Sequence, residues 1–194
     1  MQKPGYYIIN GITMYRLLMA PVLVFLIFNN NINLFKWMLA ISFFTDLIDG
    51  VLARKFWITS VFGSKLDSMA DDLTIVAAII GVFVFKPQFI YDNRAIFIIL
   101  FTLFLFQTVF ALIKYRKISS FHTYLAKVAA ILQGTFLVLM FFFPEPLYFL
   151  FYAAAIVTAL DLIEEIILVI IIPKWEANVK GVYWVYKRKA IDQR

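Results

Sequence analysis

The amino-acid sequence predicts an all-α, polytopic membrane protein, with six transmembrane helices followed by an interfacial basic C-terminal tail. Two observations predict this class. The chain has 194 residues, of which 63% are hydrophobic and 15% are charged, whereas a soluble domain carries about 25% charged residues. Apolar segments also recur along the chain, and each reaches or approaches the roughly 17–25 residues that a membrane-spanning helix needs.

Short turn sequences separate these segments. Asn29-Asn30-Asn31, Lys86 through Asn93 and Pro144-Glu145-Pro146 each combine residues that favour turns. No shift in composition marks a second domain, so we expect one membrane domain over residues 1–194. Aromatic residues stand among the cations of the tail, which is typical of an interfacial anchor. The spans are expected at about 11–28, 34–54, 63–85, 95–114, 124–143 and 147–172, with the tail at 173–194.

The distribution of lysine and arginine predicts the orientation of the spans. With a cytosolic N-terminus, fifteen of the 18 basic residues fall on the cytosolic side, and Lys36, Lys86 and Arg94 fall on the other. We therefore expect a multi-pass protein of the cell membrane with both termini on the cytoplasmic side. The net charge of +6 is then explained by attraction to the membrane surface and to phosphate, so no nucleic-acid partner is expected.

Four aspartates lie at the ends of the second and third expected spans. Asp46 and Asp49 come near the end of the second span, and Asp67 and Asp71 come near the start of the third. Residues three or four apart share one face of a helix, so each span presents a pair of carboxylates. A short loop, expected at about 55–62, returns the chain and brings all four to a similar depth near the cytosolic boundary. The active site is therefore expected on the cytoplasmic side.

This acidic cluster needs a counter-charge, because clustered carboxylates in a low-dielectric environment repel one another strongly. Helix capping or ion pairs with Arg54, Lys55 or Lys65 account for one or two aspartates, but not for paired acids on two facing helices. Divalent cations account for the whole set. The chain has no cysteine and one histidine, His122, and oxygen ligands select magnesium, calcium or manganese. Magnesium often completes its coordination with phosphate oxygens, which predicts a phosphate-bearing substrate.

Small residues and one arginine surround the aspartates. Gly50 and Ala53 remove bulk from one helix face, where a ligand can approach the backbone closely. Arg54 offers a permanently charged fork suited to phosphate, and Gly63 opens the next helix, whose first N–H groups favour anions. Each glycine taken alone is also compatible with packing or with a turn.

The pattern Asp46-x2-Asp49-Gly50-x2-Ala53-Arg54-x8-Gly63-x3-Asp67-x3-Asp71 resembles the signature of the CDP-alcohol phosphotransferase (CDP-alcohol phosphatidyltransferase) family, with every fixed position filled. The signature covers 26 residues of the chain. Six spans with the signature across the second and third also resemble this family, which includes phosphatidylglycerophosphate synthases. Further resemblance to the first helix of these enzymes is carried by Asn10, Thr13, Arg16 and Pro21, whereas Ile9 stands where a proline is common.

The resemblance implies an enzyme of phospholipid biosynthesis that transfers a phosphatidyl group from CDP-diacylglycerol to an alcohol and releases CMP. It implies two divalent ions, Mg²⁺ or Mn²⁺: Asp46 and Asp67 bridge them, Asp49 completes the first site and Asp71 the second. Asp71 also serves as the catalytic general base, whereas Asp72 points about 100° away around the helix. A homodimer is implied as well. The residues implied for the CDP moiety are Asn10, Thr13, Gly50, Ala53, Arg54, Ser60 and Gly63.

Basic residues on the cytosolic side indicate the acceptor. Arg116 and Lys117 follow the fourth span, and Lys127 lies within the fifth span rather than at its end. Ordinary topogenic charge also explains the first two, but a lysine inside an apolar helix is less easily explained that way. Together the three suit a phosphorylated acceptor, and we expect glycerol 3-phosphate. Inositol phosphate, phosphatidylglycerol and serine are the alternatives.

Three acids in the sixth span have two open interpretations. Asp161, Glu164 and Glu165 share one helix face, and they either line a polar cavity and pair with Lys127 or Arg116, or form a charged stripe at a protein–protein interface. For the whole chain, a cation transporter is the alternative class of function, since carboxylates on facing helices also bind ions. Transport sites usually lie near the bilayer midplane, however, whereas the aspartate cluster is expected at one membrane face.

Overall fold

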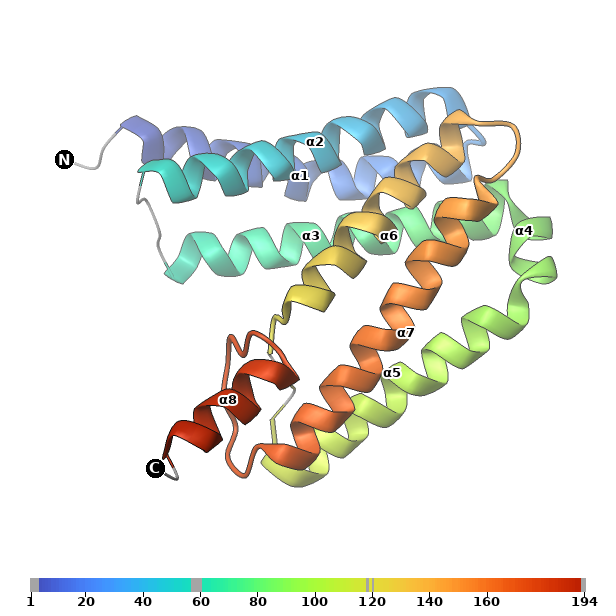
Figure 1. Cartoon of the computed structure of the whole chain (residues 1–194). Helices are drawn as coiled ribbons and strands as arrows, with labels where there is room; N and C mark the ends of the chain where they lie inside the picture. The colour runs from blue at the N-terminus through green and yellow to red at the C-terminus, as the bar shows by residue number, and fades with distance from the viewer. Residues whose placement is uncertain (1–3, 57–60, 118, 120, 193–194) are drawn as a thin grey trace. The chain divides into compact units, whose positions relative to one another are not determined.

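The computed structural model describes residues 4–56, 61–117, 119 and 121–192. In this part of the chain the secondary-structure elements are helices, and Figure 1 shows their course. The prediction of an all-α fold is confirmed for these residues. The helices are α1 (Pro4–Phe28), α2 (Ile32–Phe56), α3 (Val61–Phe85), α4 (Pro87–Asp92), α5 (Arg94–Tyr115), α6 (Tyr124–Phe142), α7 (Tyr148–Ile171) and α8 (Val182–Asp192).

The long helices α1, α2, α3, α5, α6 and α7 coincide with the six expected spans, and most of their ends differ from expectation by one or two residues. α1 begins at Pro4 rather than near residue 11, because proline is favoured at the first helical position. The expected loop at about 55–62 is too long: α2 continues to Phe56 and α3 begins at Val61. No glycine or proline precedes Phe56 closely enough to stop the helix earlier.

Two shorter helices lie outside the expected spans. α4 occupies the segment predicted as a turn between Lys86 and Asn93, and Pro87 begins it, where the missing N–H of proline costs no hydrogen bond. α8 lies in the C-terminal tail. Its mixture of aromatic and basic residues fits an interfacial helix.

The chain divides into two compact units. Unit 1 contains Met1–Tyr91 and Leu137–Glu145, and unit 2 contains Asp92–Phe136 and Pro146–Arg194. α6 therefore contributes its last residues to unit 1 and the rest of its length to unit 2.

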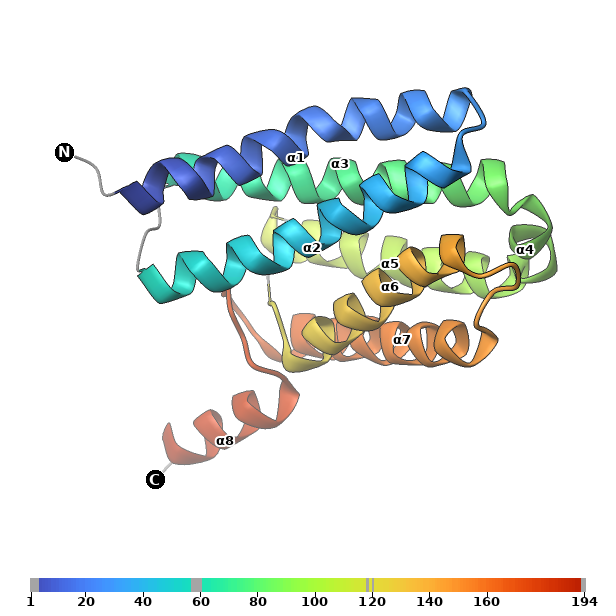
Figure 2. The ribbon, with the colours of Figure 1, turned by 90° about the horizontal axis from the view of Figure 1, so that it is seen from above.

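Unit 1 is built on three consecutive helices, in which α1 packs against both α2 and α3 (Figure 2). The expected asparagine turn joins α1 to α2. Asn30 takes a left-handed backbone conformation with φ 54°, and the N–H of Asn31 donates to the carbonyl of Leu26 at 3.0 Å. Asn31 also caps α2, because its Oδ1 accepts a hydrogen bond from the N–H of Leu34 at 3.2 Å.

Aromatic rings pack at the asparagine-turn end of unit 1. The fully buried ring of Phe35 lies 4.9 Å from that of Phe141 in α6 and 5.4 Å from that of Phe85 in α3, measured between ring centroids. Gly81 allows this approach, because a Cβ atom there would lie 2.6 Å from the Phe35 ring. The aromatic cluster therefore fixes how closely α2 approaches α3 at this end.

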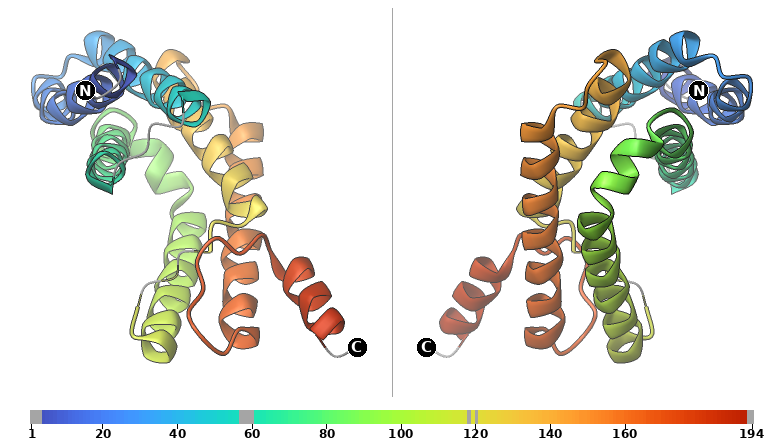
Figure 3. Two further views of the ribbon diagram at one scale, coloured as in Figure 1. Left: turned by 90° about the vertical axis from the view of Figure 1, so that its left-hand side faces the viewer. Right: turned by 90° about the vertical axis from the view of Figure 1, so that its right-hand side faces the viewer.

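In unit 2, α5 and α7 lie side by side (Figure 3). Two side chains at the end of α5 satisfy carbonyls at the end of α7: Lys114 Nζ donates to Val169 at 2.7 Å, and the Tyr115 hydroxyl donates to Ile172 at 2.8 Å. Such terminal carbonyls lack intrahelical donors. A buried cluster joins α5, α7, the loop after α5 and the C-terminal segment. Its members are Ala111, Phe121, Leu168, Val169, Ile172, Val179 and Val185.

Apolar side chains cover much of the outside of the described helices. α5 and α6 are each long and apolar enough to cross a membrane. In an apolar stretch of 18 residues in each helix, 11% of α5 and 22% of α6 is buried. Phe101 is 60% exposed and Ile113 is 75% exposed, an arrangement that water disfavours and lipid accepts. Shorter apolar stretches of 10–17 residues lie at Met14–Phe28, Ile32–Thr45 and Leu73–Phe85. The described residues thus contain two candidate spans, and the expected set of six stays a prediction.

Candidate active site

The four aspartates of the signature lie on two helices that contact each other. Asp46 and Asp49 lie in the second half of α2, and Asp67 and Asp71 lie in the first half of α3. α2 and α3 are in contact and run in opposite directions, so both pairs lie at the same end of unit 1 (Figure 1). The backbone of these residues is described, whereas their side chains lie outside the described part of the structure.

The backbone positions place the acids in two matching layers. Asp49 lies seven residues before the end of α2 and Asp67 lies six residues after the start of α3. At about 1.5 Å per residue, both lie roughly 10 Å from these helix ends. Asp46 and Asp71 each lie ten residues from the same ends, which corresponds to roughly 15 Å. Each layer therefore receives one aspartate from each helix.

Residues implied for the CDP moiety lie at the same end of unit 1. Gly50, Ala53 and Arg54 fall in the last two turns of α2, and Gly63 is the third residue of α3. The N–H of Gly63 is thus among the first four of its helix, which have no intrahelical acceptor. Ser60 lies outside the described residues.

The first half of α1 also lies at this end and carries Asn10 and Thr13 (Figure 1). One turn further along is Arg16, whose side chain is 2% exposed. A buried guanidinium stays charged and needs anionic partners. Apart from Glu145 at the turn after α6, the carboxylates in the sequence of unit 1 are those of residues 46, 49, 67, 71 and 72. Arg16 is therefore a candidate site residue that sequence reasoning did not assign, although an arginine inside an apolar run was the available signal.

In unit 2, three carboxylates of α7 accept hydrogen bonds from uncharged donors. The donors come from the loop after α5 and from the first residue of α8, so these acids fasten both segments to α7. Among the described residues, these contacts take the place of the expected pairing with Lys127 or Arg116, whereas the stripe at a protein–protein interface stays a prediction. The pairs are Thr123 Oγ1 with Asp161 at 3.1 Å, Ser119 Oγ with Glu165 at 3.4 Å, and the Val182 N–H with Glu164 at 3.1 Å.

The three cations predicted for the acceptor lie in unit 2 and differ in their surroundings. Arg116 ends α5 in a left-handed conformation with φ 55°. Lys117 Nζ lies 4.9 Å from the centroid of the Trp175 ring. Lys127 Nζ lies 5.3 Å from the centroid of the Tyr124 ring, and both residues line a cavity of about 440 Å³. Lys127 therefore has the surroundings of a binding residue.

Known proteins resemble this chain in two ways. A family model described as CDP-alcohol phosphatidyltransferase matches residues 6–171, which include the whole acidic signature. The chain is also 40% identical over 68 residues to cardiolipin synthase (CMP-forming) of Homo sapiens, a stretch that covers 34% of this chain and 22% of that protein. No solved structure matches the chain.

A second relative is the CDP-diacylglycerol–glycerol-3-phosphate 3-phosphatidyltransferase of Rickettsia typhi. It is 32% identical over 69 residues, which cover 34% of this chain and 39% of that protein. The matched stretches thus span about two fifths or less of the relatives' own lengths, whereas the family match runs from the first turn of α1 to the end of α7. On the strength of that match, the chain belongs to the CDP-alcohol phosphatidyltransferase family, as its acidic signature predicts.

Proposed function

We propose that this protein is an integral-membrane enzyme that transfers a phosphatidyl group from CDP-diacylglycerol to an alcohol and releases CMP. The observation that carries the proposal is the placement of the signature, whose aspartates lie in two layers on α2 and α3 at one end of unit 1. Arg54 and the start of α3 lie at the same end, and both suit a diphosphate. Membership of the family supports the same class of reaction.

We further propose that the acidic set holds two divalent ions, Mg²⁺ or Mn²⁺. The donor set fits these ions, because it consists of four carboxylates and hard cations take oxygen ligands. Asp46 and Asp67 would bridge the two ions, Asp49 would complete the first site and Asp71 the second. When bound, the ions would neutralise charge on the diphosphate and on the departing CMP.

Groups of the chain itself have the remaining roles in this proposal. Asp71 takes the proton of the attacking hydroxyl. Arg54 and the N–H groups at the start of α3 hold the phosphates, while Gly50 and Ala53 leave room for the nucleotide beside the backbone of α2. The other residues proposed to contact the CDP moiety are Asn10, Thr13, Ser60 and Gly63.

The acceptor that we propose is glycerol 3-phosphate, held by Arg116, Lys117 and Lys127. Charge-assisted hydrogen bonds from such cations suit a phosphate, and the Rickettsia typhi relative is named for this acceptor. Phosphatidylglycerol is the second candidate, because phosphatidyl transfer to it yields cardiolipin, and the human relative is a cardiolipin synthase. Inositol phosphate and serine complete the set of acceptors to compare.

The proposed setting is the cell membrane, crossed six times, with both termini and the active site on the cytoplasmic side of a homodimer. The outward apolar side chains of α5 and α6 support a lipid environment. The uneven distribution of lysine and arginine supports the orientation.

A direct test uses the purified protein in lipid nanodiscs with radiolabelled CDP-diacylglycerol and Mg²⁺ or Mn²⁺. CMP release is expected only when an acceptor alcohol is added, and glycerol 3-phosphate is expected to give the highest rate of the four acceptors. Faster release with phosphatidylglycerol would change the acceptor and keep the reaction. Ion flux through the protein without CMP release would instead support a cation transporter.

A further inference from the structure

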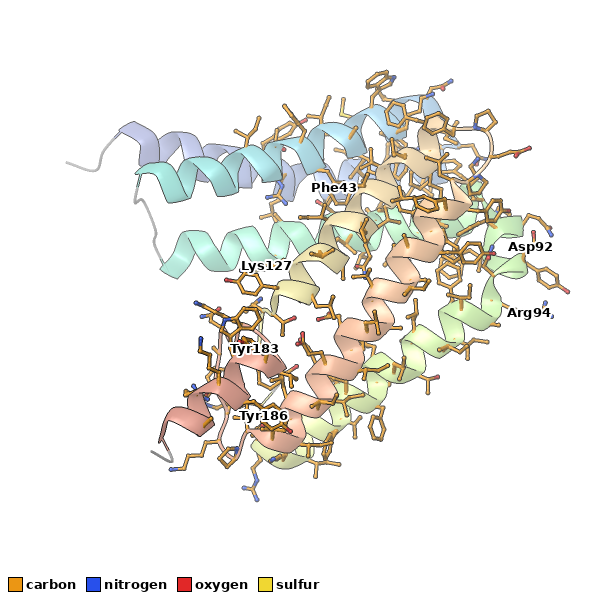
Figure 4. All side chains as sticks on the ribbon, in the orientation of Figure 1. Phe43, Asp92, Arg94, Lys127, Tyr183 and Tyr186 are labelled. Atoms are coloured by element: carbon orange, nitrogen blue, oxygen red, sulfur yellow. The ribbon has the colours of Figure 1, made fainter. Side chains whose placement is uncertain are left out.

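The cavity of about 440 Å³ in unit 2 is lined by two segments that are far apart in the sequence. Its volume falls within the range of roughly 300–1,000 Å³ that is typical of small-molecule sites. Figure 4 labels Lys127 on α6 and Tyr183 on α8, the two helices that begin beside the cavity. The lining residues are His122, Tyr124, Lys127, Asn178 and Lys180.

Aromatic packing holds the ammonium group of Lys127 at this cavity. Its Nζ lies 5.3 Å from the centroid of the Tyr124 ring, in a cation–π arrangement. The Tyr124 ring lies 5.1 Å from the ring of Trp184 in α8, again between centroids. A ring face attracts a cation but accepts no strong hydrogen bond, so the three N–H donors of Lys127 stay available to an anion.

The C-terminal segment brings Lys180 to the same cavity. The backbone N–H of Tyr124 donates to the carbonyl of Lys180 at 3.2 Å, and the N–H of Val182 donates to Glu164 at 3.1 Å. Val179 and Val185 on either side of this point are buried in the cluster that joins α5 and α7. Contacts on both sides of Lys180 therefore fix its backbone beside the start of α6.

The nearby acids of α7 hydrogen-bond to uncharged groups rather than to the lysines of the cavity. Asp161, Glu164 and Glu165 accept hydrogen bonds from Thr123, Val182 and Ser119, all of which are uncharged donors. Among the described residues, no carboxylate is ion-paired with Lys127 or with Lys180. Two ammonium groups thus face one cavity, together with the polar side chains of His122 and Asn178.

We infer that this cavity binds a phosphate group, and that the C-terminal segment supplies half of the site. Two lysines from different segments suit the oxygens of a phosphate, because each ammonium group acts as a point charge. Asn178 adds amide N–H donors. The stretch that the family model matches ends at residue 171, before Asn178 and Lys180, so the match assigns no role to this half of the site. The phosphate belongs either to a soluble phosphate monoester or to the headgroup of an anionic lipid. Because Lys127 is also a proposed acceptor residue, the inference for a soluble monoester rests on the proposed function, although its test does not measure the transfer reaction.

Residue-specific acetylation of lysine, read by peptide mass spectrometry, tests the inference on the full chain in phosphatidylcholine nanodiscs. Glycerol 3-phosphate at about ten times its dissociation constant is expected to slow the labelling of Lys127 and Lys180 about tenfold. Chloride at equal ionic strength should give no such protection, and Lys174, on the same segment but outside the cavity lining, should be labelled at an unchanged rate. In the second arm, nanodiscs that also contain phosphatidylglycerol replace the soluble monoester. Protection in the first arm identifies a soluble ligand, and protection in the second alone identifies a lipid headgroup.

Matched variants show whether the C-terminal segment contributes. Lys180→Gln is expected to weaken phosphate binding about tenfold, which is the usual loss when a charged donor is removed. At the same concentration, glycerol 3-phosphate should then slow the labelling of Lys127 only about twofold. Lys180→Arg should keep the protection, and Lys174→Gln should leave it unchanged. Absence of protection in both arms, equal protection of Lys174, or full protection of Lys127 in Lys180→Gln would each overturn the inference. None of these readouts measures CMP release, so phosphate binding and the transfer reaction are tested separately.

Discussion

The backbone N–H of Val182 donates a hydrogen bond to Glu164 Oε1 at 3.1 Å, and this contact joins the first residue of α8 to α7. Gly181 permits the close approach. A Cβ atom at that position would lie 2.8 Å from the same carboxylate oxygen, and the φ of 143° disfavours any residue with a side chain. One carboxylate of α7 thus determines where the C-terminal segment turns into α8.

Replacement of Glu164 is expected to loosen α8. In Glu164→Ala the N–H of Val182 loses its acceptor, so the backbone amides of residues 178–186 are expected to exchange about tenfold faster with deuterium. Hydrogen-exchange mass spectrometry measures this rate. Glu164→Gln keeps an oxygen acceptor and should exchange at nearly the wild-type rate. Unchanged exchange in the alanine variant would show that apolar contacts alone hold α8.

Asp71 is the residue whose loss should affect the chemical step most directly. As the proposed general base, it takes a proton in the transition state, so Asp71→Asn is expected to lower kcat by about 100- to 10,000-fold. Steady-state release of CMP measures the effect. Asp72→Asn is the matched control, because its neighbouring position points about 100° away around α3 and should leave kcat nearly unchanged. Equal losses in the two variants would remove the specific role of Asp71.

Removal of divalent ions is expected to stop CMP release and to lower the midpoint of thermal unfolding. Without ions the four carboxylates repel one another, whereas bound ions stabilise the folded state by mass action. Unfolding scans with a chelator, with Mg²⁺ and with Mn²⁺ measure the shift. Asp67→Asn should show a smaller ion-dependent shift than the wild type, because one of the proposed bridging ligands is absent. An identical midpoint with and without ions would contradict the proposed ion pair.

The helices and the signature were predictable because each is encoded in a short stretch of sequence. Apolar runs fix the six long helices, and the spacing of Asp46 with Asp49 and of Asp67 with Asp71 gives their positions on α2 and α3. α4 was missed because a proline-containing turn and a short helix that starts with proline have the same composition. Helix ends were less predictable than helix centres, as the extension of α2 to Phe56 shows.

The cavity beside Lys127 was not predictable from the sequence. It depends on contact between the start of α6 and the segment around Lys180, which lie about fifty residues apart. That contact follows from the hydrogen bonds that the α7 acids make with Ser119, Thr123 and Val182. Spacing along a helix shows that these acids share a face, but it does not show which distant groups they bind.

Gly81 is expected to be essential for the packing of unit 1. A methyl group at Gly81 would lie 2.6 Å from the ring of Phe35, which is fully buried against Phe85 and Phe141 and has little room to move. Gly81→Ala is therefore expected to destabilise the protein by about 1–3 kcal/mol, even though alanine favours helix. Chemical unfolding followed by circular dichroism measures this change. Gly11→Ala is the matched control, because among the described residues no atom beyond its chain neighbours and the nearby backbone of α1 lies within 4 Å of its added methyl group. This variant should be neutral or stabilise by up to about 1 kcal/mol.

Arg16 is expected to act as a fixed counter-charge for the aspartate cluster. Its guanidinium is buried in unit 1, where the acids other than Glu145 are those of the signature and Asp72. In Arg16→Met this charge is lost while the length of the side chain is kept, so the acids depend more on bound ions. The loss of stability is expected to be about 3–5 kcal/mol in chelator and smaller in Mg²⁺.

Unfolding in the two conditions measures the difference, and Arg16→Lys, which keeps the charge without the planar fork, should fall between the wild type and Arg16→Met. If the loss in Arg16→Met is the same in both conditions, the partner of Arg16 lies outside the ion-binding acids, and Glu145→Gln then tests the remaining carboxylate.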